Sequence, residues 1–69
     1  MAEQNNSYLV QAYDPATGQH TVMDSTGNTT SVKGLAIQGR TPEQLVGKAV
    51  EISKMVAIVS EVKQARLLK

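Results

Sequence analysis

The sequence predicts a mainly β domain, a small five-stranded barrel of the SH3-like or OB-like type with a short helical turn at residues 42–46. Three observations support this fold. Short segments rich in strand-forming residues alternate with turn sequences in the first half of the chain. Gly47 stands where a helix that begins at Pro42 would end. The second half is rich in valine and isoleucine, which lose side-chain freedom in a helix.

The chain of 69 residues is expected to form a single small domain, residues 1–69. A domain of this size buries only ~60% of the surface that its unfolded chain exposes, so its stability alone is marginal. The absence of cysteine excludes disulfides and thiolate–metal sites, and one histidine argues against a histidine-rich metal site. We therefore expect a partner to cover part of the apolar surface that this small domain cannot bury by itself. Residues 1–6 are expected to form a flexible arm unless a partner holds them.

Two hairpins are expected in the first half of the chain. Residues 7–13 are rich in strand formers and are followed by Asp-Pro-Ala-Thr-Gly, a turn in which each residue type has a known role. Residues 19–24 alternate as a half-buried strand does, and residues 25–28 form a second turn. A third strand is expected at residues 29–32. It could continue for a few residues past a bulge at Gly34.

Two tyrosines and the single histidine lie on these strands. Tyr8 and Tyr13 are five positions apart, so on a regular strand they face opposite sides. We expect one ring in the core and the other exposed. His20 is expected at the surface or at the rim of the barrel rather than as a ligand.

The helical turn has a strong start signal. Thr41 is a good N-cap, and Pro42 occupies a position where its missing N–H costs nothing. Gln44 can complete a capping box with Thr41. The turn should place Leu45 against the core.

Two folds remain open after this turn. In the barrel, Gly47 ends the turn, residues 48–53 form a strand with Val50 and Ile52 inward, and residues 55–60 form a further strand. Residues 61–68 could then be strand or helix.

The alternative is an α+β fold, a three-stranded antiparallel meander followed by one long helix at residues 42–66. Leu45, Ala49, Ile52, Val56 and Val59 would line one face of that helix. The barrel is favoured because Gly47 inside a helix costs about 1 kcal/mol. A helix of this span would also be ~40 Å long, whereas a compact domain of this size is only ~28 Å across.

The net charge of +1 is too small to indicate a nucleic-acid-binding protein by itself. The charges are unevenly placed, because residues 1–32 hold three acids and no lysine or arginine, whereas residues 33–69 hold all seven lysines and arginines and three acids. Such a split is typical of a polar contact between subunits or of a basic face. The candidate contacts for a partner or for nucleic acid are Lys33, Arg40, Lys48, Lys54, Lys63 and Arg66.

No catalytic arrangement is recognisable. General acid–base chemistry needs titratable groups held together, and here the acids are scattered, with Asp14 expected to cap its own turn. We therefore expect no enzyme activity, no cofactor, no metal and no small-molecule substrate. No apolar run approaches the ~20 residues of a membrane span, and the N-terminus lacks the features of a signal peptide. A cytoplasmic protein without membrane contact is expected, with association with a virion also considered.

The sequence thus predicts a non-catalytic structural or interaction protein that acts in a homo-oligomeric or larger assembly. A phage or mobile-element component fits its size and composition. The alternative is a small barrel that binds nucleic acid through its basic C-terminal half.

Overall fold

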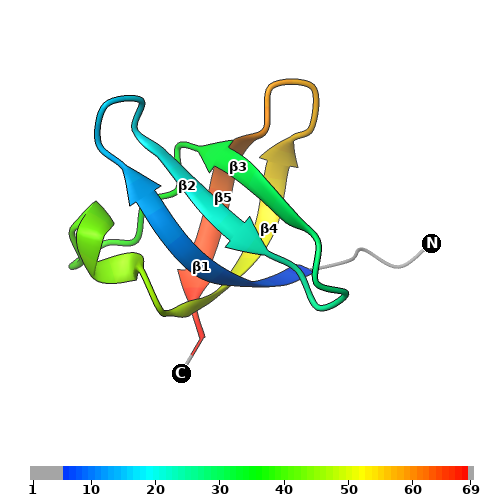
Figure 1. Ribbon diagram of the computed structural model, residues 1–69, viewed down its shortest axis with the longest axis horizontal. Coiled ribbons are helices and arrows are strands. Elements are labelled where there is room, and N and C mark those ends of the chain that lie inside the picture. The colour runs from blue at the N-terminus through cyan, green and yellow to red at the C-terminus, as the bar shows by residue number, and fades with distance from the viewer. Residues whose placement is uncertain (1–5, 69) are drawn as a thin grey trace.

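The computed structural model describes residues 6–68 and shows a closed five-stranded barrel with one short 3₁₀ turn (Figure 1). The predicted barrel is confirmed, and the alternative helix at residues 42–66 is wrong because strands occupy most of that segment. Residues 1–5 of the expected arm lie outside the described residues. Along the chain the elements are β1 (Asn6–Asp14), β2 (Gln19–Met23), β3 (Thr29–Lys33), η1 (Pro42–Leu45), β4 (Ala49–Val56) and β5 (Glu61–Leu67).

The strands follow the order β1-β2-β3-β5-β4 around the barrel, and β4 pairs with β1 to close it. All neighbours are antiparallel except β3 and β5, which meet in a parallel contact between Lys33 and Glu61. There the Lys33 amide donates to the Ser60 carbonyl over 2.9 Å. With the helical turn between β3 and β4, this connectivity is that of an OB-like barrel, one of the two expected types.

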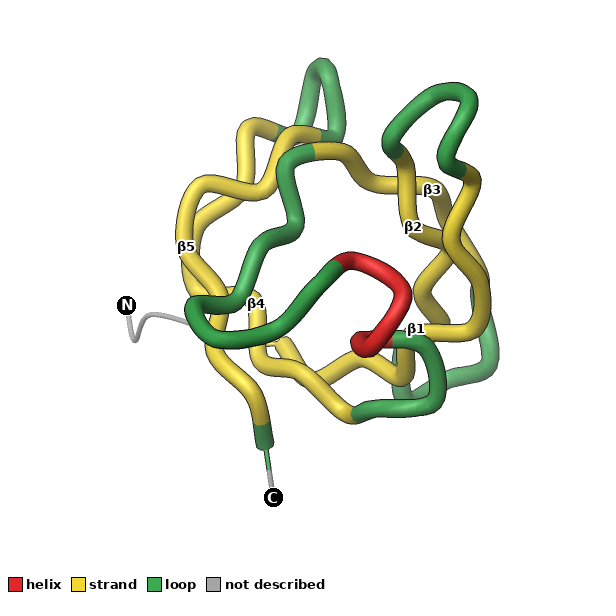
Figure 2. Tube along the Cα trace, turned by 90° about the vertical axis from the view of Figure 1, so that its left-hand side faces the viewer, coloured by secondary structure: helices red, strands yellow, loops and turns green. Residues whose placement is uncertain are grey.

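The η1 turn begins as the sequence predicts. The Thr41 hydroxyl accepts a bond from the Gln44 amide at 3.3 Å, and the Gln44 side chain accepts one from the Thr41 amide at 3.0 Å. Gly47, with φ +86°, follows the turn in the left-handed region. Figure 2 shows η1 lying across one opening of the barrel. From there Leu45, only 1% exposed, reaches the core.

The core is almost entirely aliphatic. Leu45, Val50 and Ile52 are buried, as predicted. Tyr8, Ile37, Met55, Ala65 and Leu67 are partly buried against this core. Within residues 6–68, no helix is long and apolar enough to cross a membrane. The buried apolar residues are Val10, Val22, Val32, Leu35, Leu45, Val50, Ile52 and Val62.

Two predicted strand boundaries are wrong. The third strand does not continue past Gly34, because Gly34 adopts φ +77° and the next residues have no strand structure. Leu35 is nevertheless buried in the core. The strand expected at residues 55–60 does not exist either: β4 ends at Val56 and residues 57–60 form a turn.

The expectation that one tyrosine would be exposed is also wrong. Tyr8 pairs with buried Val50, and Tyr13 pairs with buried His20, so both tyrosines lie on the inner face of β1. The β1–β2 register shifts just after Val10, which adds one residue to β1. This bulge reverses the alternation and brings both rings to the same side.

His20 is buried in the barrel rather than at its rim. Its Nε2 lies 3.1 Å from the Pro42 carbonyl oxygen, and its ring lies 4.5 Å from that of Tyr13. A carbonyl can only accept, so Nε2 carries the proton in this bond. The contact ties β2 to η1. The other ring nitrogen, Nδ1, has no hydrogen-bond partner among residues 6–68.

Candidate interaction surface

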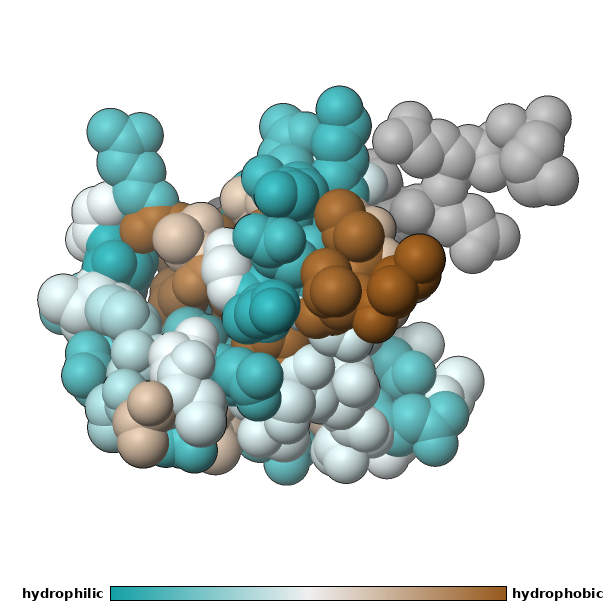
Figure 3. Space-filling view, turned by 90° about the horizontal axis from the view of Figure 1, so that it is seen from above, coloured by the Kyte–Doolittle hydropathy of each residue, from teal (hydrophilic) through white to brown (hydrophobic). Residues whose placement is uncertain are grey.

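Among the large apolar side chains of residues 6–68, the two most exposed lie where β4 turns into β5. Ile58 is 95% exposed, and Val56 and Val59 are 40% and 46% exposed. We call these three residues the hairpin tip. Figure 3 looks down on the end of the barrel where this hairpin turns and shows apolar side chains gathered in one patch. Single exposed apolar residues are ordinary, but three within four positions form a patch of the kind that marks interaction sites.

Three of the four residues in the turn of this hairpin are apolar types that do not favour turns. Residues 57–60 are Ala-Ile-Val-Ser, without the glycine, proline, asparagine or aspartate that stabilise most tight turns. Ser60 has φ +53°, and among residues 6–68 no other non-glycine residue has a positive φ. Its amide donates to the Ala57 carbonyl over 3.3 Å. Conflicts of this type between local sequence and local structure concentrate at functional sites.

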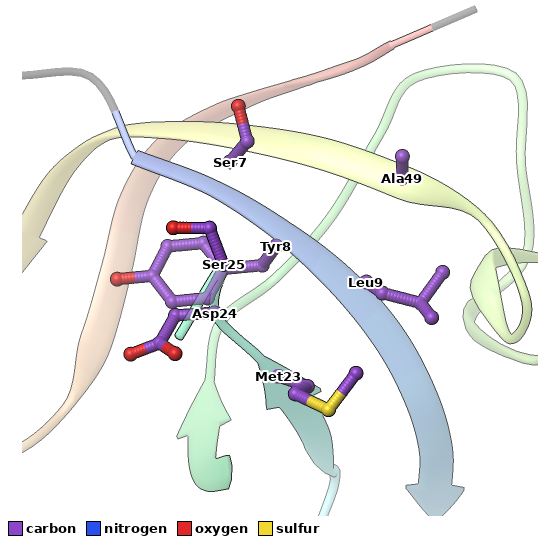
Figure 4. A pocket seen from close by; sticks show the side chains of 7 residues that line it. All are labelled: Ser7, Tyr8, Leu9, Met23, Asp24, Ser25 and Ala49. Atoms are coloured by element: carbon purple, nitrogen blue, oxygen red, sulfur yellow. The ribbon is translucent and has the colours of Figure 1, made fainter. Parts of the chain in front are cut away.

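A second apolar feature lies on the outer surface of β1. It is a shallow hollow of about 220 Å³, which we call the Leu9 hollow. Leu9 pairs with Met23 on one side and with Ala49 on the other, so these three side chains share one face of the sheet. Figure 4 shows the side chains that surround it. The lining residues are Ser7, Tyr8, Leu9, Met23, Asp24, Ser25 and Ala49.

Asp24, at the rim of the hollow, organises the turn between β2 and β3. Its Oδ1 accepts bonds from the Thr26 hydroxyl at 2.7 Å, the Thr26 amide at 2.9 Å and the Asn28 amide at 3.0 Å. These bonds, above all that of the Thr26 hydroxyl, lower the pKa of Asp24 below its ordinary value of 3.8. The rim therefore carries a negative charge at neutral pH.

Replacing Asp24 with asparagine is expected to destabilise the protein at pH 7, because the charged acceptor of this turn is lost. The folded pKa of Asp24 lies below its unfolded value, so the contribution is complete above the unfolded pKa. It is lost as the pH falls through the folded pKa. Denaturant titrations from pH 7 to pH 3 should show the difference between the wild type and Asp24→Asn shrinking with acidification. A difference that stays constant down to pH 3 would contradict this assignment.

The fold does not gather the six basic candidate residues into one site. Lys63 lies 3.4 Å from Glu61, and the Arg66 Nε lies 2.6 Å from the Glu51 Oε1. Exposed pairs such as Lys63–Glu61 are typically worth about 0–1 kcal/mol, but they reduce the charge available to a ligand. The other four have no ion-pair partner among residues 6–68: Lys33 at the end of β3, Arg40 before η1, Lys48 after it, and Lys54 in β4.

The comparisons with known proteins give no further guide to function. No family model, no curated protein and no solved structure matches this chain. Function is therefore inferred from the geometry of the two apolar features and from the placement of the charges.

The acidic and histidine side chains of the described segment form no metal-binding cluster. Within residues 6–68, no three His, Cys, Asp or Glu side chains are close enough together to hold a metal ion. Asp14 accepts a bond from the Ala16 amide at 3.0 Å, which is the turn-capping role predicted for it. The buried Nε2 of His20 is already bonded to a backbone carbonyl.

The sequence prediction did not identify the hairpin tip. Residues 55–60 are rich in strand-forming residues, so the sequence predicted a strand that includes Ile58 and Val59. A spacing argument could have located the turn, because a hairpin must reverse somewhere between the inward-facing Ile52 and Val62. Any reversal near the middle of that interval exposes apolar residues, since Met55 to Val59 are all apolar.

Proposed function

We propose that this chain is a non-catalytic interaction protein that works in a homo-oligomeric or larger assembly. The observation that carries the proposal is the hairpin tip, where Val56, Ile58 and Val59 are exposed together on a strained turn. Exposed β-branched side chains at a hairpin reversal make the folded monomer less soluble and do nothing for its core. A partner that covers them removes that cost.

The test is the mass of the protein in solution, measured by light scattering across a wide range of concentration. We expect a mass above that of one chain, increasing with concentration, because a contact made by a hairpin tip is small and therefore weak. A strict monomer at every concentration, with cooperative unfolding at high temperature, would contradict the homo-oligomeric form of the proposal.

Nucleic-acid binding is the second candidate, and the OB-like connectivity is the observation in its favour, since such barrels commonly bind single strands. Sites of that kind usually add aromatic side chains on which bases stack. Here Tyr8 and Tyr13 lie on the inner face of β1 and provide no such platform. Lys33 and Lys54 would be the basic contacts near the β4–β5 turn, since Lys63 is paired with Glu61.

The two candidates separate in a titration with labelled single-stranded DNA and RNA at low and high salt. A nucleic-acid site requires an affinity that falls steeply with salt, because phosphate contacts release counterions. The variant Lys33→Ala with Lys54→Ala should then reduce both the affinity and the salt slope. Absence of binding at low salt would remove this second candidate.

A further inference from the structure

The hairpin tip and the Leu9 hollow lie at different ends of the barrel. The hollow includes Ala49 at the start of β4, whereas the tip begins with Val56 at the end of the same strand. Eight strand residues span roughly 23 Å, so the tip cannot reach the hollow of its own chain. In Figure 1 the turn between β4 and β5 lies opposite the turn between β2 and β3, which borders the hollow.

The two features match in size and chemistry. Leu9, Met23 and Ala49 supply apolar walls, and the hollow of about 220 Å³ exceeds the ~150 Å³ that accommodates a benzene molecule in a protein cavity. That space is sufficient for the side chain of Ile58, with Val59 against the rim. Ile58 is almost fully exposed and projects from a narrow turn, so it can enter a shallow hollow without a clash from its own barrel.

The charges around the two features are complementary. Of the seven lining residues, six belong to residues 7–25, a segment that holds Asp14 and Asp24 and no glutamate, lysine or arginine. Three lysines lie near the base of the hairpin, and Glu61 is the neighbouring acid. Lys33 is the strand partner of Glu61 where β3 meets β5, and Lys63 forms an ion pair with Glu61. Lys54 lies two residues before the tip. An ionised Asp24 at the rim therefore favours the approach of this hairpin.

We propose that the hairpin tip of one copy inserts into the Leu9 hollow of a second copy, forming a head-to-tail contact. This inference rests on the proposed function and names its partner and interface. The contact is heterologous, because each copy offers a tip to one neighbour and a hollow to another. Repetition gives a ring if the rotation between copies closes, and an open filament if it does not.

The experiment uses two full-length variants and their mixture. Ile58→Asp keeps the hollow and loses the tip, whereas Leu9→Asp keeps the tip and loses the hollow. Each variant alone should self-associate roughly 10- to 100-fold more weakly than the wild type, the factor expected for the burial of one aliphatic side chain. An equimolar mixture should recover one contact and form a 1:1 dimer, because the tip of Leu9→Asp fits the hollow of Ile58→Asp.

The matched control is Val46→Asp, which places a charge on an exposed apolar residue outside both features. It should associate as the wild type does. Circular dichroism checks that each variant is folded, and Val59→Ser and Met23→Ser replace any variant that is not.

Two results would overturn the inference while leaving the proposed function intact. The variants could associate as strongly as the wild type, or both could lose association without any recovery in the mixture, which indicates a symmetric contact. A wild type that is monomeric in solution at all concentrations would instead contradict both this inference and the homo-oligomeric form of the proposed function. If that monomer binds phosphatidylserine vesicles in an Ile58-dependent manner, the tip is assigned to a lipid surface.

Discussion

Replacing Leu45 with alanine is expected to lower the free energy of unfolding by about 2–5 kcal/mol. Leu45 is 1% exposed and is the side chain through which η1 reaches the core at the opening of the barrel. A single core in a domain of this size rarely supplies more than about 3–5 kcal/mol, so the variant should be largely unfolded at room temperature. Urea titration followed by circular dichroism measures the effect, and Leu45→Asp should abolish folding.

The neighbouring residue provides the control for this prediction. Val46 is exposed, and Val46→Ala removes apolar atoms from the same turn without leaving a cavity in the core. Its effect should stay within about 0.5 kcal/mol, as for most surface substitutions. Equal effects at positions 45 and 46 would show that η1 does not close the core.

Replacing Gly34 with alanine is expected to have the second largest effect. Gly34 has φ +77°, and a Cβ there would lie 2.9 Å from the backbone oxygen of Val62. That oxygen belongs to β5, so relief of the clash requires movement at the seam where β3 meets β5. The left-handed conformation costs alanine about 1–2 kcal/mol, and overpacking against backbone adds about 1–3 kcal/mol. Thermal unfolding should show a fall in Tm of ten degrees or more, on the order of 4–8 °C per kcal/mol.

Gly47→Ala separates the two contributions. Gly47 has φ +86°, but nothing lies within 4 Å of the position that its Cβ would occupy. This variant should therefore lose only the conformational part, about 1–2 kcal/mol. If Gly34→Ala and Gly47→Ala are equally destabilised, the close approach of Gly34 to β5 is not a constraint on the barrel. A stabilised Gly47→Ala would instead indicate a continuous helix, contrary to the structure.

The local features of the fold could be predicted because each depends on residues that are neighbours in the chain. The capping box of Thr41 and Gln44 and the turn capped by Asp14 are complete within a few positions. The inward positions of Val50 and Ile52 follow from strand alternation alone. Gly47 could be identified because a left-handed residue after a helical turn is usually glycine.

The positions that were predicted wrongly depend on register between distant strands. The bulge after Val10 lies just beyond Leu9, the last residue of β1 that pairs with β4, and it turns Tyr13 inward. His20 is buried because η1, twenty-two residues away, supplies the Pro42 carbonyl as its partner. Alternation within β2 places His20 on the same face as buried Val22, but nothing within β2 identifies the partner that satisfies a buried polar ring.

The sequence by itself determined a small β domain without disulfides, the turns that join its first three strands, and the start of its 3₁₀ turn. Only the tertiary structure decided that β4 reverses at residues 57–60 and leaves Ile58 in solvent. The reason is closure of the barrel. The parallel contact of Lys33 with Glu61 fixes where β5 must begin, and the chain has to turn just before it, whatever residues stand there. The exposed apolar tip is a consequence of that placement.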